Sequence, residues 1–409
     1  MIFKKISKFL IILGVISIIY WPKVFQGEFS IPLRFELIFF LGILAGLIYL
    51  IGIVIFKNKV AVTKKETELF LILLIFFTSV ILATAISLAR YNLWFDYQGL
   101  AILLKLIIGI LLLIVSLKFI KEDQRFYKKL SLAFFVPSLI FIPFLMLPDL
   151  ASRIGLLSGG ERFQGLTANP GQWAHIAIIS FSYLLVLSLY SAYRKETISM
   201  LYFALTIGMG ALIFWSQSRG YLVAMILITI LSIATLQIYF KKSWKKSLSY
   251  LTLGTILIFF AFLFMPSSIK PRLEIRIQQM LNLENEPRIM AWQYYSRLIP
   301  SNLLGLGVNF EQKFLVDLTN PNGERQKAGP HSMIDLWIYG GFVALFCMFY
   351  LLKQSFLNLK RKIKEKNNPL IAYIIGTQMA LTAIWIAALF SGAPINYLHC
   401  WILFAMALV

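Results

Sequence analysis

Several basic residues interrupt a sequence dominated by apolar side chains, and their setting favours binding of an anion. Arg162 precedes a turn rich in glycine and proline, and Arg219 stands in a Ser-Arg-Gly triplet. Arg288 comes four residues before Trp292, so the two lie on one face of a predicted helix. His331 follows a Gly-Pro pair, and histidine exchanges protons near neutral pH. These residue types suit electrostatic recognition of phosphate together with general-base chemistry.

The turn that contains Arg162 lies directly before an apolar segment. The run 162–165 reads Arg-Phe-Gln-Gly, and the run 169–171 reads Asn-Pro-Gly. Glycine and proline set a turn there, which puts Arg162 at the edge of the membrane. One interpretation is an interfacial arginine on phospholipid head groups. The other is an anion site in which Arg162 is the donor and Asn169 holds the turn.

Arg219 and Arg288 also have two interpretations each. Arg219 points along the outer surface, or it faces the helix bundle, where a bound phosphate would serve as its partner. Arg288 and Trp292 suit a phosphate beside a sugar or isoprenoid surface. Alternatively, Arg288 pins its own loop helix through a salt bridge to Glu284 or Glu286.

Few other side chains are candidates for chemistry. His331 fits a general base or a structural residue at a helix start. His175 and His399 lie in or beside apolar spans, and a structural role is favoured for both. Cys347 and Cys400 both fall inside apolar spans, so no disulfide framework is expected. No Cys/His spacing typical of a metal site and no glycine-rich phosphate loop occurs. The prediction is therefore no metal and no cofactor.

The composition predicts a membrane protein without a soluble domain. Hydrophobic residues make up 59% of the 409 positions and charged residues 14%, whereas a soluble domain has roughly half and a quarter. Apolar runs long enough to cross a bilayer recur throughout, which predicts an all-α, polytopic transmembrane helix bundle of about twelve spans in one domain, 1–409. The expected spans are 6–21, 37–56, 69–88, 99–117, 130–147, 172–193, 199–217, 220–240, 248–266, 333–352, 369–391 and 394–409.

Basic residues set the predicted orientation. The segments that concentrate Lys and Arg are the N-terminus, 57–68, 118–129, 194–195, 241–246 and 353–366. By the positive-inside rule these segments and both termini are cytoplasmic. The net charge of +21 then reflects cytoplasmic loops and anionic head groups rather than nucleic acid. Lys105, inside a span, either snorkels outward or lines a cavity.

The opposite, extracytoplasmic face collects the unusual segments. It carries 148–172, the tight turn 216–220 and a long loop, 267–332, inserted between the ninth and tenth spans. A loop of this length is usually functional. The spacing of apolar and polar residues from 288 to 298 predicts an amphipathic helix, so we expect the loop to contain short helices.

These outward motifs, in this order, resemble those of the O-antigen ligase and O-antigen polymerase superfamily. They read RFQGLTANPG at 162–171, SQSRG at 216–220, RIMAW at 288–292 with GLG at 305–307, and HSMIDLWIYGG at 331–341. Two positions depart from the pattern: Ser332 stands where the family often has Asn, and Gly171 stands where a polar residue is common. Neither departure removes a proposed catalytic group, but both leave the subfamily open.

The resemblance implies a GT-C-like membrane glycosyltransferase of the bacterial inner membrane that acts on the extracytoplasmic face, inverting and independent of metal. The donor would be a glycan on a polyprenyl diphosphate such as undecaprenyl diphosphate. The acceptor would be a sugar hydroxyl of a glycan or glycolipid, in assembly of lipopolysaccharide or another surface polysaccharide. The implied catalytic residues are His331 as base with Arg219 and Arg288 on the diphosphate. The implied substrate-binding residues are Arg162, Asn169, Trp292, Gly305 and Gly307.

Other functions remain open at this point. A polymerase would transfer the glycan to another lipid-linked repeat rather than to a separate acceptor, although the single long loop that ends at His331 favours a ligase. A transporter or a lipid-linked glycan flippase would place functional charges near the bilayer midplane, whereas this sequence concentrates them at the outer face. In a non-catalytic scaffold, Arg219, Arg288 and His331 would not converge.

Overall fold

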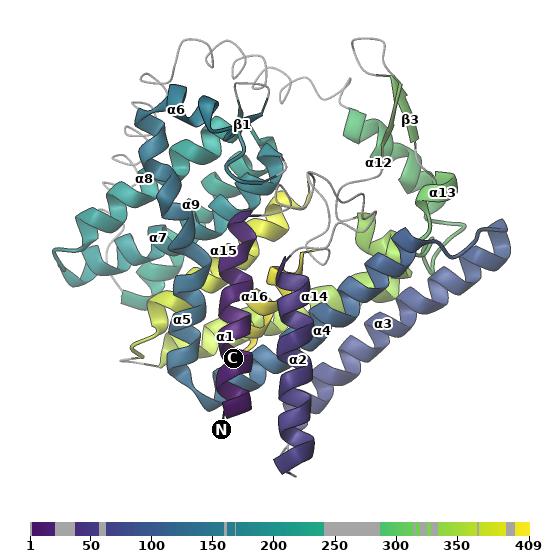
Figure 1. The fold of residues 1–409 in the computed structure, drawn as a ribbon, viewed down its shortest axis with the longest axis horizontal. Coiled ribbons are helices and arrows are strands. Elements are labelled where there is room, and N and C mark those ends of the chain that lie inside the picture. The colour runs from purple at the N-terminus through teal and green to yellow at the C-terminus, as the bar shows by residue number, and fades with distance from the viewer. Residues whose placement is uncertain are drawn as a thin grey trace.

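The chain folds as an all-α, multi-pass membrane protein, as the sequence predicts (Figure 1). The structure is a computed structural model. It describes residues 2–20, 37–56, 63–158, 162–167, 169–240, 287–314, 316–319, 325–328, 334–365, 368–389 and 397–409.

The described residues form mainly helices. The helices are α1 (Ile2–Ile16), η1 (Ser17–Tyr20, a 3-10 helix), α2 (Leu37–Phe56), α3 (Lys64–Tyr91), α4 (Tyr97–Glu122), α5 (Gln124–Phe135), η3 (Pro137–Met146, a 3-10 helix), α6 (Pro148–Arg153), α7 (Pro170–Arg194), α8 (Ser199–Ser216), α9 (Arg219–Phe240), α12 (Pro287–Leu298), α13 (Glu311–Phe314), α14 (Ile334–Lys364), α15 (Ile371–Ala387) and α16 (Leu398–Leu408). The strands are β1 (Leu157–Ser158), β2 (Arg162–Phe163), β3 (Val316–Thr319) and β4 (Arg325–Ala328), which pair as two antiparallel hairpins.

The helices coincide with the predicted spans. Among the described residues, 7 helical segments are long and apolar enough to cross a membrane, and α15 and α16 are shorter apolar helices. Each predicted span matches a helix or a pair of consecutive helices, apart from 248–266, which lies outside the described residues. The agreement follows from the length of apolar sequence that a bilayer requires.

The predicted span 130–147 is not one continuous α-helix. It begins in α5 and continues as the 3-10 helix η3 after Val136. Pro137 starts η3 and Pro143 lies inside it, and proline has no N–H to donate to the preceding turn. The change to the tighter 3-10 geometry is the expected response to two prolines six residues apart.

Helix α7 occupies the centre of the bundle. It contacts α8, α9 and α15, and 89% of its spanning segment is buried inside the protein, against 33% for α3. Polar groups inside this centre bond to one another: the hydroxyls of Tyr127 and Tyr183 lie 2.8 and 2.7 Å from that of Thr377 on α15. α3 presents apolar side chains outward instead, as expected for a lipid-facing helix.

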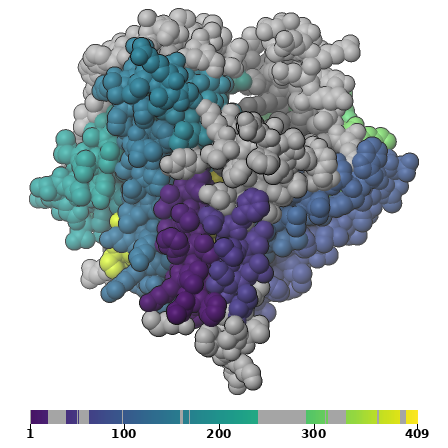
Figure 2. All heavy atoms as spheres, viewed as in Figure 1, coloured from purple at the N-terminus to yellow at the C-terminus, as the bar shows by residue number. Residues whose placement is uncertain are grey.

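Ion pairs gather three of the predicted cytoplasmic segments at one end of the molecule. Lys4 pairs with Glu122 at 3.1 Å, and Lys8 pairs with Asp123 at 2.9 Å, so the N-terminal helix is held to the junction of α4 and α5. Lys121 pairs with Glu66 at 3.0 Å, at the start of α3. Figure 2 shows α1 and α2, which contact each other, side by side on one face. The N-terminus lies at the opposite end from β1, α12 and β3 (Figure 1).

The long loop contains the predicted helix and also a strand hairpin. Helix α12 covers the predicted amphipathic segment, and Tyr295 on it is fully buried with its hydroxyl donating to the carbonyl of Phe314 at 2.6 Å. The expectation of short helices alone was incomplete, because β3 and β4 pair in register from Val316–Ala328 to Thr319–Arg325. The intervening sequence contains Asn322-Gly323, a strong hairpin signal.

Candidate functional site

An aromatic cluster fixes the position of Arg162. Phe163, next to it in β2, is fully buried, and its ring lies 5.3 Å from that of Trp173 and 5.2 Å from that of Trp215. Phe141 on η3 closes the cluster, 6.0 Å from Phe163. Because side chains alternate along a strand, burial of Phe163 turns Arg162 to the other side of β2, where it is half-buried.

Arg162 is hydrogen-bonded to the turn that contains Arg219. Its Nε donates to the carbonyl oxygen of Ser216, the last residue of α8, at 3.0 Å. A cation at the carboxyl end of a helix is favourable, because the last carbonyls carry partial negative charge. Gln217 then adopts a left-handed conformation with φ of 54° and ends the helix. Two motifs separated by more than fifty residues are thus joined.

Asn169 caps the central helix beside the same turn. Its side chain accepts from the backbone N–H of Gln172 at 2.9 Å, and Pro170 occupies the first position of α7. This is the arrangement that asparagine and proline favour at a helix start. A Cβ atom on Gly171 would lie 3.2 Å from Oδ1 of Asn169 and 3.8 Å from Oγ of Ser218. A side chain at Gly171 would therefore crowd the cap oxygen of Asn169, whereas its contact with the α8–α9 turn would be an ordinary one.

Arg219 is the first residue of α9 and is half-buried. The backbone N–H groups of Tyr221 and Leu222 donate to the carbonyl of Ser218, which starts the helix. Arg162, Asn169 and Arg219 come from three elements that meet at the turn between α8 and α9. The prediction that the tight turn 216–220 joins two spans is correct.

A second group forms where the Gly-Leu-Gly turn meets α14. The backbone N–H groups of Leu306 and Gly307 both donate to the carbonyl of Ile338, at 2.7 and 2.9 Å. That carbonyl is accessible because α14 is kinked at Gly340 and Gly341, the latter at φ of 66°. Two of the motif segments quoted from the sequence, 305–307 and 331–341, are therefore locked to each other.

The glycines of this turn are required by space as well as by conformation. A Cβ on Gly305 would lie 2.7 Å from the carbonyl oxygens of Trp337 and Ile338. A Cβ on Gly307, whose φ is 73°, would lie 2.5 Å from Cα of Thr84. Both distances are too short for any side chain, so Gly305 and Gly307 position the loop against α3 and α14. Direct contact with substrate, the role implied by the resemblance, stays a prediction for these two glycines.

Helix α12 contains both Arg288 and Trp292, in agreement with their predicted placement on one helix. Trp292 is half-buried. For Arg288 the structure describes the backbone, which places it one helical turn before Trp292. His331, Glu284 and Glu286 lie outside the described residues.

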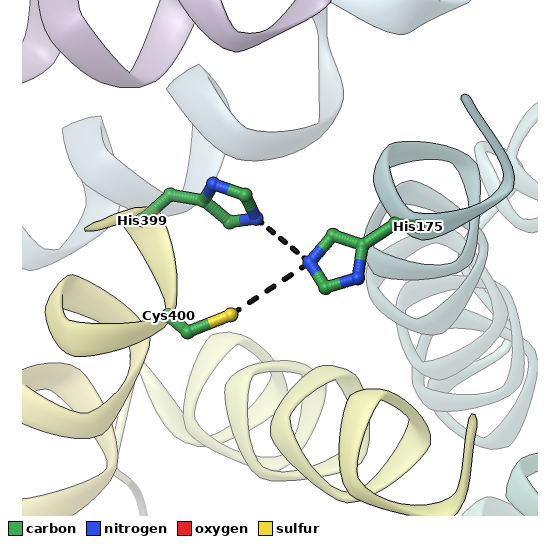
Figure 3. A group of neighbouring side chains, drawn as sticks. All are labelled: His175, His399 and Cys400. Carbon is green, nitrogen blue, oxygen red and sulfur yellow. Dashed lines mark hydrogen bonds between the residues drawn. The ribbon is translucent and has the colours of Figure 1, made fainter. Parts of the chain in front are cut away.

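A cluster that sequence analysis treated as structural is buried in the centre of the bundle. His175 on α7 and His399 on α16 direct their Nε2 atoms at each other, 2.8 Å apart, and Sγ of Cys400 lies 3.7 Å from Nε2 of His175 (Figure 3). All three residues are at most 1% exposed. His175 stands more than two hundred residues before His399 and Cys400, so no local spacing in the sequence predicts the cluster.

Fold and site together define a class: a multi-pass helical membrane protein in which arginine-bearing turns meet at the ends of the spanning helices. Residues 202–349 match the family model of the O-antigen ligase, so this part of the chain is similar to that family, and the match supports the resemblance to the superfamily. The match supports an O-antigen ligase- or polymerase-like function in the membrane. It includes Arg219, Arg288 and His331, whereas Arg162 and Asn169 precede it. No curated protein matches the chain.

Proposed function

We propose that this protein transfers a glycan from a polyprenyl-diphosphate carrier to a sugar hydroxyl on the extracytoplasmic face of the bacterial inner membrane. The observation that carries the proposal is the meeting of the RFQG and SQSRG motifs through the Arg162–Ser216 hydrogen bond, in a chain that matches the O-antigen ligase family. In this proposal both termini are cytoplasmic, and the loop 267–332 is extracytoplasmic and covers the glycan.

The reaction is a single displacement at the anomeric carbon. The acceptor oxygen forms a bond to that carbon, the bond from the carbon to the diphosphate oxygen breaks, and the configuration inverts. The acceptor proton moves to His331, and the polyprenyl diphosphate leaves with the electron pair and its negative charge. The leaving group is already a stable anion, so electrostatic stabilisation by arginines is sufficient and no metal is needed at the diphosphate.

The arginines have distinct roles in this proposal. Arg219 and Arg288 bind the diphosphate, and Arg162 supports them. The carbonyl of Ser216 at the end of α8 holds the Arg162 guanidinium close to the start of α9. Asn169 keeps the adjacent cap in place, and Trp292 offers an aromatic surface to a sugar or to the isoprenoid chain.

Three alternatives differ in what they make or move. A polymerase of the same superfamily would extend a second molecule of donor. A transporter or flippase would move lipid-linked glycan across the bilayer without forming a new glycosidic bond. In a non-catalytic scaffold, the three proposed catalytic groups would have no common substrate. Two observations favour the enzyme over the transporter and the scaffold. They are the family match and the position of the arginines at helix ends.

The test is a transfer assay with the purified full-length protein in lipid nanodiscs. Radiolabelled polyprenyl-diphosphate glycan is offered with a panel of acceptors that includes a lipid A core glycolipid. We expect His331→Ala to lower the rate by about 10²–10⁴-fold, the usual contribution of a general base. Gln293→Ala, on the exposed side of α12, is the control and should keep the wild-type rate.

Each outcome decides between the alternatives. Product on the glycolipid that is lost in His331→Ala supports a ligase, and elongation of the donor identifies a polymerase. Full activity of His331→Ala would overturn the assignment of the base. Absence of any product, with glycan crossing a vesicle membrane, would establish a transporter.

A further inference from the structure

The side chains of His175, His399 and Cys400 converge on one point inside the helix bundle. Figure 3 shows the two imidazoles and the thiol pointing toward one another, from α7 on one side and the start of α16 on the other. The potential ligand atoms all lie within 4.8 Å of one another. Buried imidazoles need polar partners, and here each histidine has the other as a partner through Nε2, with the thiol beside them.

The distances are close to those around a tetrahedral metal ion. With metal–nitrogen bonds of about 2.05 Å and a metal–sulfur bond of about 2.3 Å, tetrahedral angles separate nitrogen and sulfur by about 3.6 Å and two nitrogens by about 3.3 Å. Sγ of Cys400 lies 3.7 Å from Nε2 of His175. The Nε2 atoms of His175 and His399 are 2.8 Å apart, so an ion bound to both requires this distance to increase by roughly 0.5 Å.

The surroundings of His175 fit a metal ligand. Its second ring nitrogen, Nδ1, lies 2.9 Å from the hydroxyl of Tyr221 on α9. A ligating histidine characteristically donates its other N–H to an oxygen, which fixes the tautomer and leaves Nε2 free to bind the ion. The ring of Tyr397 lies 4.4 Å from that of His175, which further restricts its orientation.

We propose that His175, His399 and Cys400 bind a thiophilic transition-metal ion, Zn²⁺ or Cu⁺, that joins α7 to α16. Thiolate and imidazole together favour these ions over Mg²⁺ or Ca²⁺. Binding replaces the hydrogen bond between the histidines: the Cys400 thiol loses its proton to solvent, and His399 carries its remaining proton on Nδ1. Each site filled therefore releases one proton.

The ion has a structural role in this inference, which does not depend on the glycosyl transfer proposed above. The three ligands are buried in the bundle, whereas Asn169 and Arg219 lie at the helix ends. Tyr221 connects the two regions, because it lies two residues after Arg219 and contacts His175. The ion thus joins the second turn of α7 to α16 directly, and the first turn of α9 to α16 through Tyr221.

The test is metal analysis of the purified full-length protein and of two matched cysteine variants. The metal content is measured by mass spectrometry after purification without chelators. The bound metal is then removed by dialysis against a chelator, and Co²⁺ is added to the metal-free protein as a spectroscopic probe. Cys400→Ser removes the ligand, and Cys347→Ser makes the same change at a buried cysteine of α14 outside the cluster. Tyr221→Phe removes only the hydroxyl beside His175.

We expect the wild type and Cys347→Ser to hold about one equivalent of zinc or copper and to show a sulfur-to-cobalt charge-transfer band. Cys400→Ser should lose that band, and Tyr221→Phe should bind Co²⁺ about 10–100-fold more weakly. The metal that copurifies identifies which ion is native. Wild-type protein that neither contains nor takes up a metal, or a band that persists in Cys400→Ser, would overturn the proposal and leave a hydrogen-bonded histidine pair. If Cys400→Ser fails to fold, the Tyr221→Phe affinity and the wild-type band decide.

Discussion

The two ends of the helix bundle hold their basic side chains in different ways. At the end with the N-terminus, Lys4, Lys8 and Lys121 pair with carboxylates at 3.1, 2.9 and 3.0 Å. At the other end, Arg90 donates to the backbone carbonyl of Ser301 at 2.9 Å, and Arg162 donates to that of Ser216 at 3.0 Å. A carboxylate neutralises the cation that it holds, whereas a carbonyl positions the cation and leaves its charge unchanged.

This difference bears on what each end can do. Lysine–carboxylate pairs at a surface stabilise the fold slightly and close the contact between α1, α3 and the α4–α5 junction. A guanidinium that donates one N–H to a carbonyl has further N–H donors with which it can bind an anion. We therefore expect changes at the carbonyl-bonded end to affect activity, and changes at the ion-paired end to affect stability.

The largest expected effect is the loss of transfer on replacing Arg219. Removing one donor to developing negative charge costs about 2–4 kcal/mol, so Arg219→Gln should lower kcat/KM by about 30–1,000-fold. The thermal midpoint should stay near that of the wild type, because glutamine is tolerated in the first turn of a helix. The measurement is the transfer assay on protein whose midpoint has been determined in the same nanodiscs.

Arg153→Gln is the matched control for this change, since Arg153 is an exposed arginine at the end of α6, outside the quoted motifs. It should retain wild-type kcat/KM. Equal losses in both variants would mean that general positive charge matters, and the contrast between the two ends would lose its functional meaning.

A second prediction concerns the turn that locks the long loop. Gly307→Ala should destabilise the protein by about 2–4 kcal/mol, because the added methyl group meets the backbone of Thr84 and the left-handed conformation disfavours alanine. The thermal midpoint should fall, and proteolysis of the loop should accelerate.

Gly210→Ala provides the comparison for Gly307→Ala. A Cβ at Gly210 would lie 3.5 Å from the ring of Phe181, which is an ordinary contact, and alanine suits the interior of α8. If Gly210→Ala destabilises the protein as much as Gly307→Ala does, the lock between the loop and α14 has no special importance.

The smallest expected effect lies at the ion-paired end. The hydrogen bond from Lys8 and its charge lower the pKa of Asp123 from its ordinary value. A carboxyl with a lowered pKa in the folded protein stabilises it above the unfolded pKa of about 3.9, and this stabilisation is lost as pH falls through the folded pKa. Because both side chains are partly exposed, the contribution should stay below about 1 kcal/mol.

Asp123→Asn tests this contribution while keeping the cap of α5, since the amide oxygen can still accept from the N–H of Arg125. The difference in thermal midpoint between wild type and variant should be small at pH 7 and should shrink further toward pH 3. A difference that grows on acidification would contradict the assigned direction.

The sequence predicts the helices well because one physical requirement, about twenty apolar residues, defines a span. It predicts the break at η3 less well, although Pro137 and Pro143 carry the signal. The β3–β4 hairpin was also detectable, since Asn322-Gly323 favours a tight turn. Both features are encoded in turn chemistry, to which the hydropathy of a segment is insensitive.

The candidate site is only partly accessible to sequence reasoning. The motifs around Arg162 and Arg219 are contiguous, so they could be found, but their hydrogen-bonded contact depends on the aromatic cluster of Phe163. The cluster of His175, His399 and Cys400 depends on the packing of α16 in the bundle, and no local period encodes that packing. Long-range pairs of this kind require a three-dimensional structure.

The bonds from Leu306 and Gly307 to the Ile338 carbonyl have a consequence for how the loop can be altered. These bonds hold the residues before 308 next to the helix that follows 333. The number of residues in the stretch 308–333 can therefore change without shifting the register of the flanking helices. Residues added within the β3–β4 connection should extend its reach, whereas one residue inserted between Leu303 and Gly307 should misalign the clamp. A longer β3–β4 connection is therefore expected to enlarge the loop while the flanking helices keep their register.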